Sequence, residues 1–299
     1  MSDAEAPAFP APSAAVPPFE PRRGARVCGV CNALNGVDFE RCIRCGVALG
    51  ARPGRAARAP LGVGGRIVVA LTLVVFAGQV AVSLLHDHAL PLLGGGNNED
   101  ALRFGALLVD RAALSAEPWR ALSATFVHFG LLHVASNLLG LVWLARLAEP
   151  AIGADRFVLA YVGSGLAGWA ASAVRSLAMH APASLNAGAS GAVFGLLGLV
   201  LGWMVRTRDP RWKGFAFNAV ILSLAFGFAL NGAGTLVSGK GAAISIDNTA
   251  HVGGLLFGLA SGVAFAGELR APRWLLRLGA ALALVASVAA LVWSQLVSA

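Results

Sequence analysis

The chain has 299 residues, of which 57% are hydrophobic and 13% are charged. Soluble globular domains carry about 25% charged residues, so this composition excludes an ordinary soluble fold and indicates a polytopic membrane protein. The formal net charge is +8. The basic residues lie mostly before the first apolar run and in short loops, which indicates membrane topology rather than nucleic-acid binding.

The N-terminal part of the chain differs in composition from the rest. Residues 1–25 are a tail rich in Pro and Ala, a composition that predicts disorder. Residues 26–50 hold all four cysteines, and residues 51–65 form a basic linker. Residues 1–60 lack the apolar run of a cleavable signal peptide, so the first span is expected to act as its own signal.

The four cysteines predict a structural zinc site. Cys28-x2-Cys31 and Cys42-x2-Cys45 have the pairwise spacing with which four thiolates hold a tetrahedral zinc ion. A redox pair or a chance arrangement is the alternative. The module is similar to Ran-binding-protein zinc fingers, although Arg26 stands where those carry a Trp, and more generally to a zinc ribbon. Its ligand stays open, with a cytosolic protein partner favoured over nucleic acid.

The remainder predicts an all-α polytopic bundle. Apolar runs cover residues 67–85, 127–147, 156–174, 190–205, 215–237, 250–267 and 274–297, close to the roughly 20 residues of a membrane-spanning helix. Residues 66–268 are expected to form a six-helix core, and residues 269–299 a seventh helix. The Arg-rich segment before the first run and the basic loops 206–213 and 268–277 place the N-terminus in the cytosol.

This topology brings polar residues of three spans to one depth. His133 and Asn137, Ser190, and His251 all lie near the outer ends of their spans. From Ser190 to Arg206 is 16 residues, or about 24 Å of helix, against a hydrocarbon core about 30 Å thick. Ser190 is therefore expected to lie below the outer surface, in a site that admits water.

Glycine stripes predict that the spans of Ser190 and His251 pack closely against each other. One stripe contains Gly191 and Gly195, and the other contains Gly254 and Gly258. Small residues at such spacing let helix backbones approach closely in lipid. Stripes of this kind often do nothing but pack helices; the Ser and the His at their heads favour a functional contact.

A serine and a histidine in contact predict nucleophilic hydrolysis. His251 would act as general base on Ser190, and His133, Asn137 and the Ser190 amide would stabilise the oxyanion. Asp247 lies one turn before His251 and could orient it, although a dyad is the simpler interpretation. Taken alone, Ser190 would fit the N-cap of a helix. Taken alone, His251 would fit a polar residue between helices whose hydrogen bonds are satisfied.

These motifs resemble those of the rhomboid intramembrane serine proteases. The residues that carry the likeness are Gly188, Ser190, Gly191 and Gly195 for GxSGxxxG; Ala250, His251, Gly254 and Gly258 for AHxxGxxxG; His133 and Asn137 for HxxxN; Glu149 and Gly153 for ExxxG; and Trp119, Arg120 and His128 before them. The resemblance implies that Ser190 and His251 are catalytic, that His133, Asn137 and the Ser190 amide form the oxyanion hole, and that Trp119, Arg120, His128 and Glu149 are structural. Phe194 stands where many members carry a Tyr.

The expected function is intramembrane serine endopeptidase, acting on transmembrane helices of other proteins within the lipid bilayer. Catalysis needs no cofactor, and zinc is confined to the N-terminal module. The active site is expected toward the outer side of a bacterial inner membrane. The alternative is a non-catalytic rhomboid-like scaffold that binds transmembrane clients. A transporter is disfavoured because the polar groups stop at one depth.

Overall fold

The computed structural model describes residues 26–28, 34–35, 39–42, 49, 60–86, 98–221, 246–266 and 272–297. The chain forms two compact units, Met1–Gly54 and Arg55–Ala299. In the first, β1 (Arg26–Val27) pairs antiparallel with β2 (Leu34–Asn35). Cys28 follows β1 directly, and Cys28 and Cys42 are both buried. Cys31 and Cys45 lie outside the described residues, so the zinc site stays a prediction.

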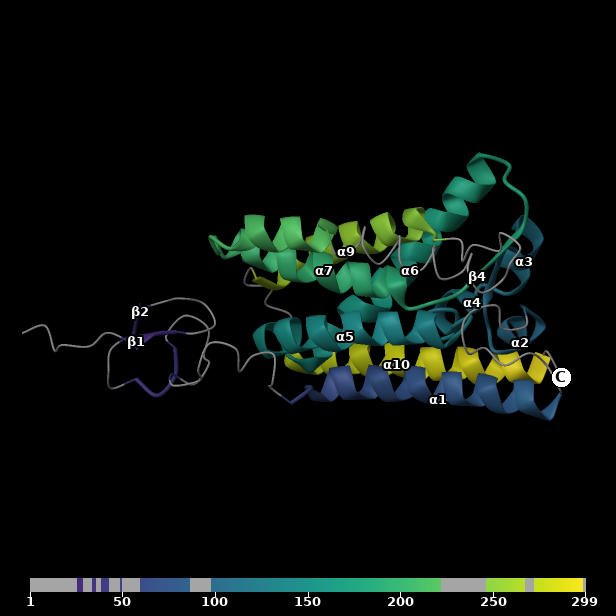
Figure 1. Ribbon diagram of the computed structural model, residues 1–299, viewed down its shortest axis with the longest axis horizontal. Helices are drawn as coiled ribbons and strands as arrows, with labels where there is room; N and C mark the ends of the chain where they lie inside the picture. Colours follow the sequence, from purple (N-terminus) through teal and green to yellow (C-terminus); the bar gives the residue numbers. More distant parts are fainter. Residues whose placement is uncertain are drawn as a thin grey trace, which may run out of the picture. The chain divides into compact units, whose positions relative to one another are not determined.

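The second unit is a bundle of apolar helices (Figure 1). Its long helices are α1 (Val63–Leu85), α5 (Leu131–Ile152), α6 (Ala154–Ala178), α9 (Asn248–Ala266) and α10 (Arg273–Val297). These five are long and apolar enough to cross a membrane, and α7 (Ser190–Arg206) is a shorter apolar helix of 17 residues. Helices suit this environment because they satisfy their backbone hydrogen bonds internally. The predicted all-α membrane bundle is confirmed.

Several helix boundaries differ by a few residues from the expected runs. The run expected at 127–147 forms a helix that begins at Leu131 and continues through Pro150 to Ile152, because residues 124–130 form turns that pack inside the protein. Of the run expected at 215–237, the structure describes a helix over residues 212–221, and the remainder lies outside the described residues.

Short elements join the first two long helices of the bundle. They are α2 (Asn98–Arg103), β3 (Leu107–Val109), α3 (Arg111–Ala116) and α4 (Arg120–Ser123). The strand β3 pairs antiparallel with β4 (Ser184–Asn186), with Leu107 opposite Asn186. This small ribbon ties the α2–α4 segment to the residues just before α7.

Helices α7 and α9 meet backbone to backbone. A Cβ atom added to Gly258 of α9 would collide with the carbonyl oxygen of Gly195 of α7. A Cβ atom added to Gly254 would collide in the same way with the carbonyl oxygen of Gly191. On the α7 side, a Cβ at Gly195 would collide with Ser164 of α6. The close approach that the glycine stripes predicted is therefore present, and at these positions glycine is required for space.

Glu149 joins the end of α5 to the beginning of α1. Its carboxylate accepts hydrogen bonds from the amides of Gly64 at 2.8 Å and Gly65 at 2.9 Å. First-turn amides have no partner within their own helix, and the helix dipole favours an anion there. The side chain is buried, so it closes the helix end away from solvent.

The glycine contact predicts a clear difference between two alanine variants. Gly258→Ala should destabilise the protein by roughly 1–3 kcal/mol, because the added methyl forces α7 and α9 apart. Gly279→Ala in α10 is the matched control, because its Cβ would meet Leu159 at an ordinary 3.5 Å. It should be neutral or stabilising by up to about 1 kcal/mol. Thermal unfolding in detergent measures both, and equal melting temperatures would contradict the contact.

Candidate active site

Ser190 is the first residue of α7, and a glycine with positive φ lies two residues before it. Gly188 has a φ of 127°, a backbone conformation that residues with a side chain rarely adopt. A Cβ there would lie 2.7 Å from the His133 ring. The Gly188 amide donates to the Ala124 carbonyl at 2.9 Å. The turn just before α7 therefore packs against His133, next to first-turn amides that have no partner within their own helix.

His251 lies in the first turn of α9 and contacts Ser190 directly. The distance from His251 Nε2 to Ser190 Oγ is 2.8 Å, which is hydrogen-bonding distance. The histidine that the sequence placed at the head of one glycine stripe thus meets the serine at the head of the other. This contact is the geometry that a serine nucleophile and its general base require.

Phe194 holds the imidazole of His251 from one face. The two rings are stacked, with centroids 4.2 Å apart and an interplanar angle of 4°. Phe194 lies one helical turn after Ser190, so α7 supplies both the hydroxyl and the ring that position His251. The phenyl ring therefore provides the stacking contact without a tyrosine hydroxyl.

The carboxylate of Asp247 forms its hydrogen bonds with the start of α9 and with α6. Its Oδ1 accepts from the amides of Thr249 and Ala250, both at 3.0 Å. Its Oδ2 accepts from the hydroxyl of Ser172 in α6, and its carbonyl accepts from the His251 amide at 3.2 Å. From the sequence, Asp247 was an alternative orienting partner of the His251 ring. In the structure, Asp247 caps α9 and fastens this helix to α6.

Ser172 was missed by sequence reasoning. It is one of several serines in α6, and no local motif marks it. The capping role of Asp247 could have been found, because an Asp immediately before a helix is a typical N-cap. Its partner on α6 depends on how the two helices pack.

His133 and Asn137 lie together on α5, beside the turn at Gly188. Asn137 Nδ2 donates to the His133 carbonyl at 2.9 Å, which leaves its second N–H for another acceptor. His133 is buried, and its Nδ1 makes no hydrogen bond among the described residues. Phe129 stacks on the same ring, with centroids 6.2 Å apart. Two polar groups with spare hydrogen-bonding capacity therefore lie beside Gly188, two residues before Ser190.

His128 links three parts of the chain around the site. Its Nδ1 donates to the Phe126 carbonyl at 3.1 Å, and its Nε2 accepts from the amide of Ala189 at 3.3 Å. Its backbone exchanges two hydrogen bonds with the Gln79 side chain of α1. Burial, with a smaller effect of the neighbouring His133, lowers the pKa of His128 well below its usual value. The neutral ring suits one donated and one accepted hydrogen bond.

Trp119 and Arg120 fasten the α2–α4 segment. Arg120 is buried, and it donates to Glu117 Oε2 at 2.6 Å and to the Leu102 carbonyl at 2.5 Å. The ring of Trp119 meets Trp293 of α10 edge to face, with centroids 6.3 Å apart. These residues therefore hold α2, α4 and α10 together and take no direct part in the Ser190–His251 contact.

A family model described as the rhomboid domain matches residues 115–268, just over half of the chain. The chain belongs to the rhomboid family. Members of this family are intramembrane serine proteases, although some rhomboid-like members are inactive. The family and the apolar helices together show an integral, multi-pass membrane protein.

Individual relatives agree with this assignment. Rhomboid protease GluP of Bacillus subtilis is 33% identical over 183 residues, covering 60% of this chain and 32% of that protein. RHOMBOID-like protein 1 of Arabidopsis thaliana is 33% identical over 191 residues, covering 64% and 44%. Rhomboid protease GlpG of Serratia proteamaculans is 31% identical over 195 residues, covering 63% and 60%. The chain thus spans between about a third and three fifths of these relatives.

The cap on α9 predicts a local change in hydrogen exchange. Asp247→Ala should speed exchange at Thr249 and Ala250 by roughly two- to thirtyfold, because losing an N-cap costs about 0.5–2 kcal/mol. Asp247→Asn keeps an acceptor oxygen and should stay near wild type. Hydrogen–deuterium exchange with mass spectrometry measures both.

Asp110→Ala is the matched control for this experiment. Asp110 caps α3 in the same way, through the amides of Ala112 and Ala113, and within the described part of the chain its carboxylate makes no hydrogen bond to α6. Its loss should change exchange in α3 and leave α9 unaffected. Unchanged protection of α9 in Asp247→Ala would contradict the capping role.

Proposed function

We propose that this rhomboid is an intramembrane serine endopeptidase in which Ser190 is the nucleophile and His251 the general base. The observation that carries the proposal is the 2.8 Å distance between His251 Nε2 and Ser190 Oγ, in a family of intramembrane serine proteases. Phe194 and the Asp247 cap support it, because they fix the ring and the helix that present Nε2 to the hydroxyl.

The chemistry follows from these two side chains. His251 Nε2 takes the hydroxyl proton of Ser190 as Oγ attacks the carbonyl carbon of the substrate peptide bond. The C–N bond then breaks, and His251 gives the proton to the leaving amine. A water molecule, deprotonated by His251, hydrolyses the resulting ester and restores Ser190. The dyad needs neither a metal nor ATP for these steps.

The proposed oxyanion hole consists of His133, Asn137 and the Ser190 amide. The second N–H of Asn137 and the ring of His133, whose Nδ1 makes no hydrogen bond among the described residues, both lie beside Gly188, two residues before Ser190. The start of α7 adds an amide and the positive end of the helix dipole. Together these groups can stabilise the negative charge that develops on the substrate oxygen.

The proposed substrates are transmembrane helices of other membrane proteins. A helix must open before a protease can reach its backbone, so helices with small or helix-breaking residues near the cleavage point should be preferred. The basic segments of the sequence favour a cytosolic N-terminus and a site toward the outer side of a bacterial inner membrane. The alternative function is a non-catalytic scaffold that retains transmembrane clients.

The proposed zinc module is separate from catalysis. Cys28 and Cys42 are both buried in the N-terminal unit, and Cys28 directly follows β1 of the β1–β2 pair. Buried thiols next to a short antiparallel pair suit a structural zinc site, which Cys31 and Cys45 would complete. Bound zinc would stabilise the small module, and a cytosolic protein partner is its proposed ligand.

The test of the protease is cleavage of a model transmembrane substrate by purified protein in detergent. Ser190→Ala should lower the cleavage rate at least about a thousandfold, because the nucleophile is lost. Ser136→Ala is the matched control: this serine of α5 hydrogen-bonds the His133 carbonyl but does not contact His251. It should retain most of the activity. Equal rates in wild type and Ser190→Ala would contradict the proposal and favour the scaffold.

The zinc proposal is tested by metal analysis of the purified full-length chain. Wild type should contain about one zinc ion per chain, and Cys28→Ser and Cys42→Ser should contain almost none. Glu40→Gln, an exposed change in the same unit that keeps every thiol, should retain the metal. A wild-type protein without zinc, prepared under reducing conditions with zinc supplied, would refute the site.

A further inference from the structure

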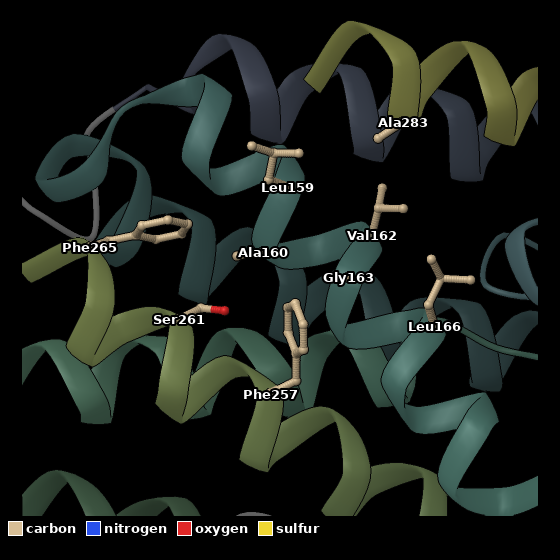
Figure 2. Close-up of a pocket in the computed structure, with 9 residues that line it drawn as sticks. All are labelled: Leu159, Ala160, Val162, Gly163, Leu166, Phe257, Ser261, Phe265 and Ala283. Atoms are coloured by element: carbon tan, nitrogen blue, oxygen red, sulfur yellow. The ribbon is translucent and has the colours of Figure 1, made fainter. Parts of the chain in front are cut away.

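An apolar groove lies between α6, α9 and α10, away from the proposed active site. Figure 2 shows its lining, and its volume is about 310 Å³. Leu159 and Leu166 mark its length along α6, and Phe257 and Phe265 mark it along α9. Each pair is seven or eight residues apart, so the groove follows the helices for roughly 10–12 Å.

Small residues stand among the larger ones in the lining of the groove. Ala283 is the lining residue from α10, and Ser261 of α9 is the one polar side chain in the lining. The other end of α10 is held elsewhere: Gln295 donates to the Arg103 carbonyl at 3.0 Å. The position of α10 beside the groove is thus fixed in part by a hydrogen bond at its far end.

Positive charge lies at one end of the groove. The guanidinium carbon of Arg156 is 5.7 Å from the centroid of the Phe265 ring, which lines that end. Arg156 Nε is buried and makes no hydrogen bond among the described residues. Nearby, Arg277 of α10 meets Asp155 at a long 3.8 Å and is mostly exposed. A buried donor without a hydrogen bond and a weakly paired cation therefore lie at this end of the groove.

We propose that the groove binds an anionic phospholipid, with an acyl chain along α6 and the phosphate between Arg156 and Arg277. The apolar lining matches a hydrocarbon chain that enters from the bilayer. The phosphate would supply the acceptor that Arg156 Nε lacks, and basic residues between helices attract anionic headgroups. This site goes beyond the proposed protease function and does not depend on it.

The size of the groove disfavours a transmembrane helix as its occupant. A helix about 10 Å across fills 310 Å³ in roughly 4 Å of its length, which is less than one turn. A single acyl chain is narrow enough to extend through the whole groove. Water is disfavoured because Ser261 is the one polar side chain that could hold it.

The experiment is native mass spectrometry of the full chain in detergent, with palmitoyl-oleoyl phosphatidylglycerol or phosphatidylcholine added. Wild type should retain one phosphatidylglycerol in preference to phosphatidylcholine. Arg156→Gln should reduce that preference about fivefold, the effect of one basic residue on an anionic lipid. Arg206→Gln, the same charge change at the end of α7, should leave it unchanged.

Filling the groove from either wall gives an independent measurement. Ala283→Phe and Ser261→Phe should each abolish retention of both lipids, and Ala289→Phe, at an exposed position of α10, should not. Cooperative thermal unfolding shows which variants are folded, and one folded filling variant is enough to test the proposal. Lipid retention that survives filling, equal retention of both lipids in wild type, or a co-purified protein that the filling variants release would overturn the proposal.

Discussion

The backbone contact between α7 and α9 is the constraint on which the proposed site depends. Gly195 and Gly258 bring the two helices so close that a single methyl group would force them apart. In lipid, such packing cannot rely on the hydrophobic effect between helices and comes from close van der Waals contact. Because Ser190 and His251 lie at the heads of these helices, their 2.8 Å contact follows from the same packing.

Further contacts determine the positions of the N-terminal ends of α7 and α9. At α7, the β3–β4 ribbon, the positive φ of Gly188 and the His128 bond to the Ala189 amide determine where the helix begins. At α9, the Asp247 cap and its bond to Ser172 do the same. At the beginnings of α7 and α9, His128 and Asp247 thus accept hydrogen bonds from backbone amides that the bilayer could not hydrate.

The sequence predicts those parts of the structure that depend on composition and spacing. The apolar runs predicted the membrane bundle, and the glycine stripes predicted which helices touch. Polar residues at one depth predicted the meeting of Ser190 with His251. Contacts between distant elements were not predictable: the β3–β4 pairing, the Ser172–Asp247 bond and the groove beside Arg156 depend on how helices pack in three dimensions. The start of α5 was also missed, because apolar residues before Leu131 pack in turns.

Covalent labelling of Ser190 tests the central claim most directly. A fluorophosphonate reacts with a serine whose hydroxyl is activated by a neighbouring base. Peptide mass spectrometry of the labelled wild-type protein should find the adduct on Ser190, and the same experiment on His251→Ala should find almost none. A wild-type protein without an adduct, or labelling of Ser190 that persists at the wild-type rate in His251→Ala, would contradict the account of these residues as a nucleophile and its base.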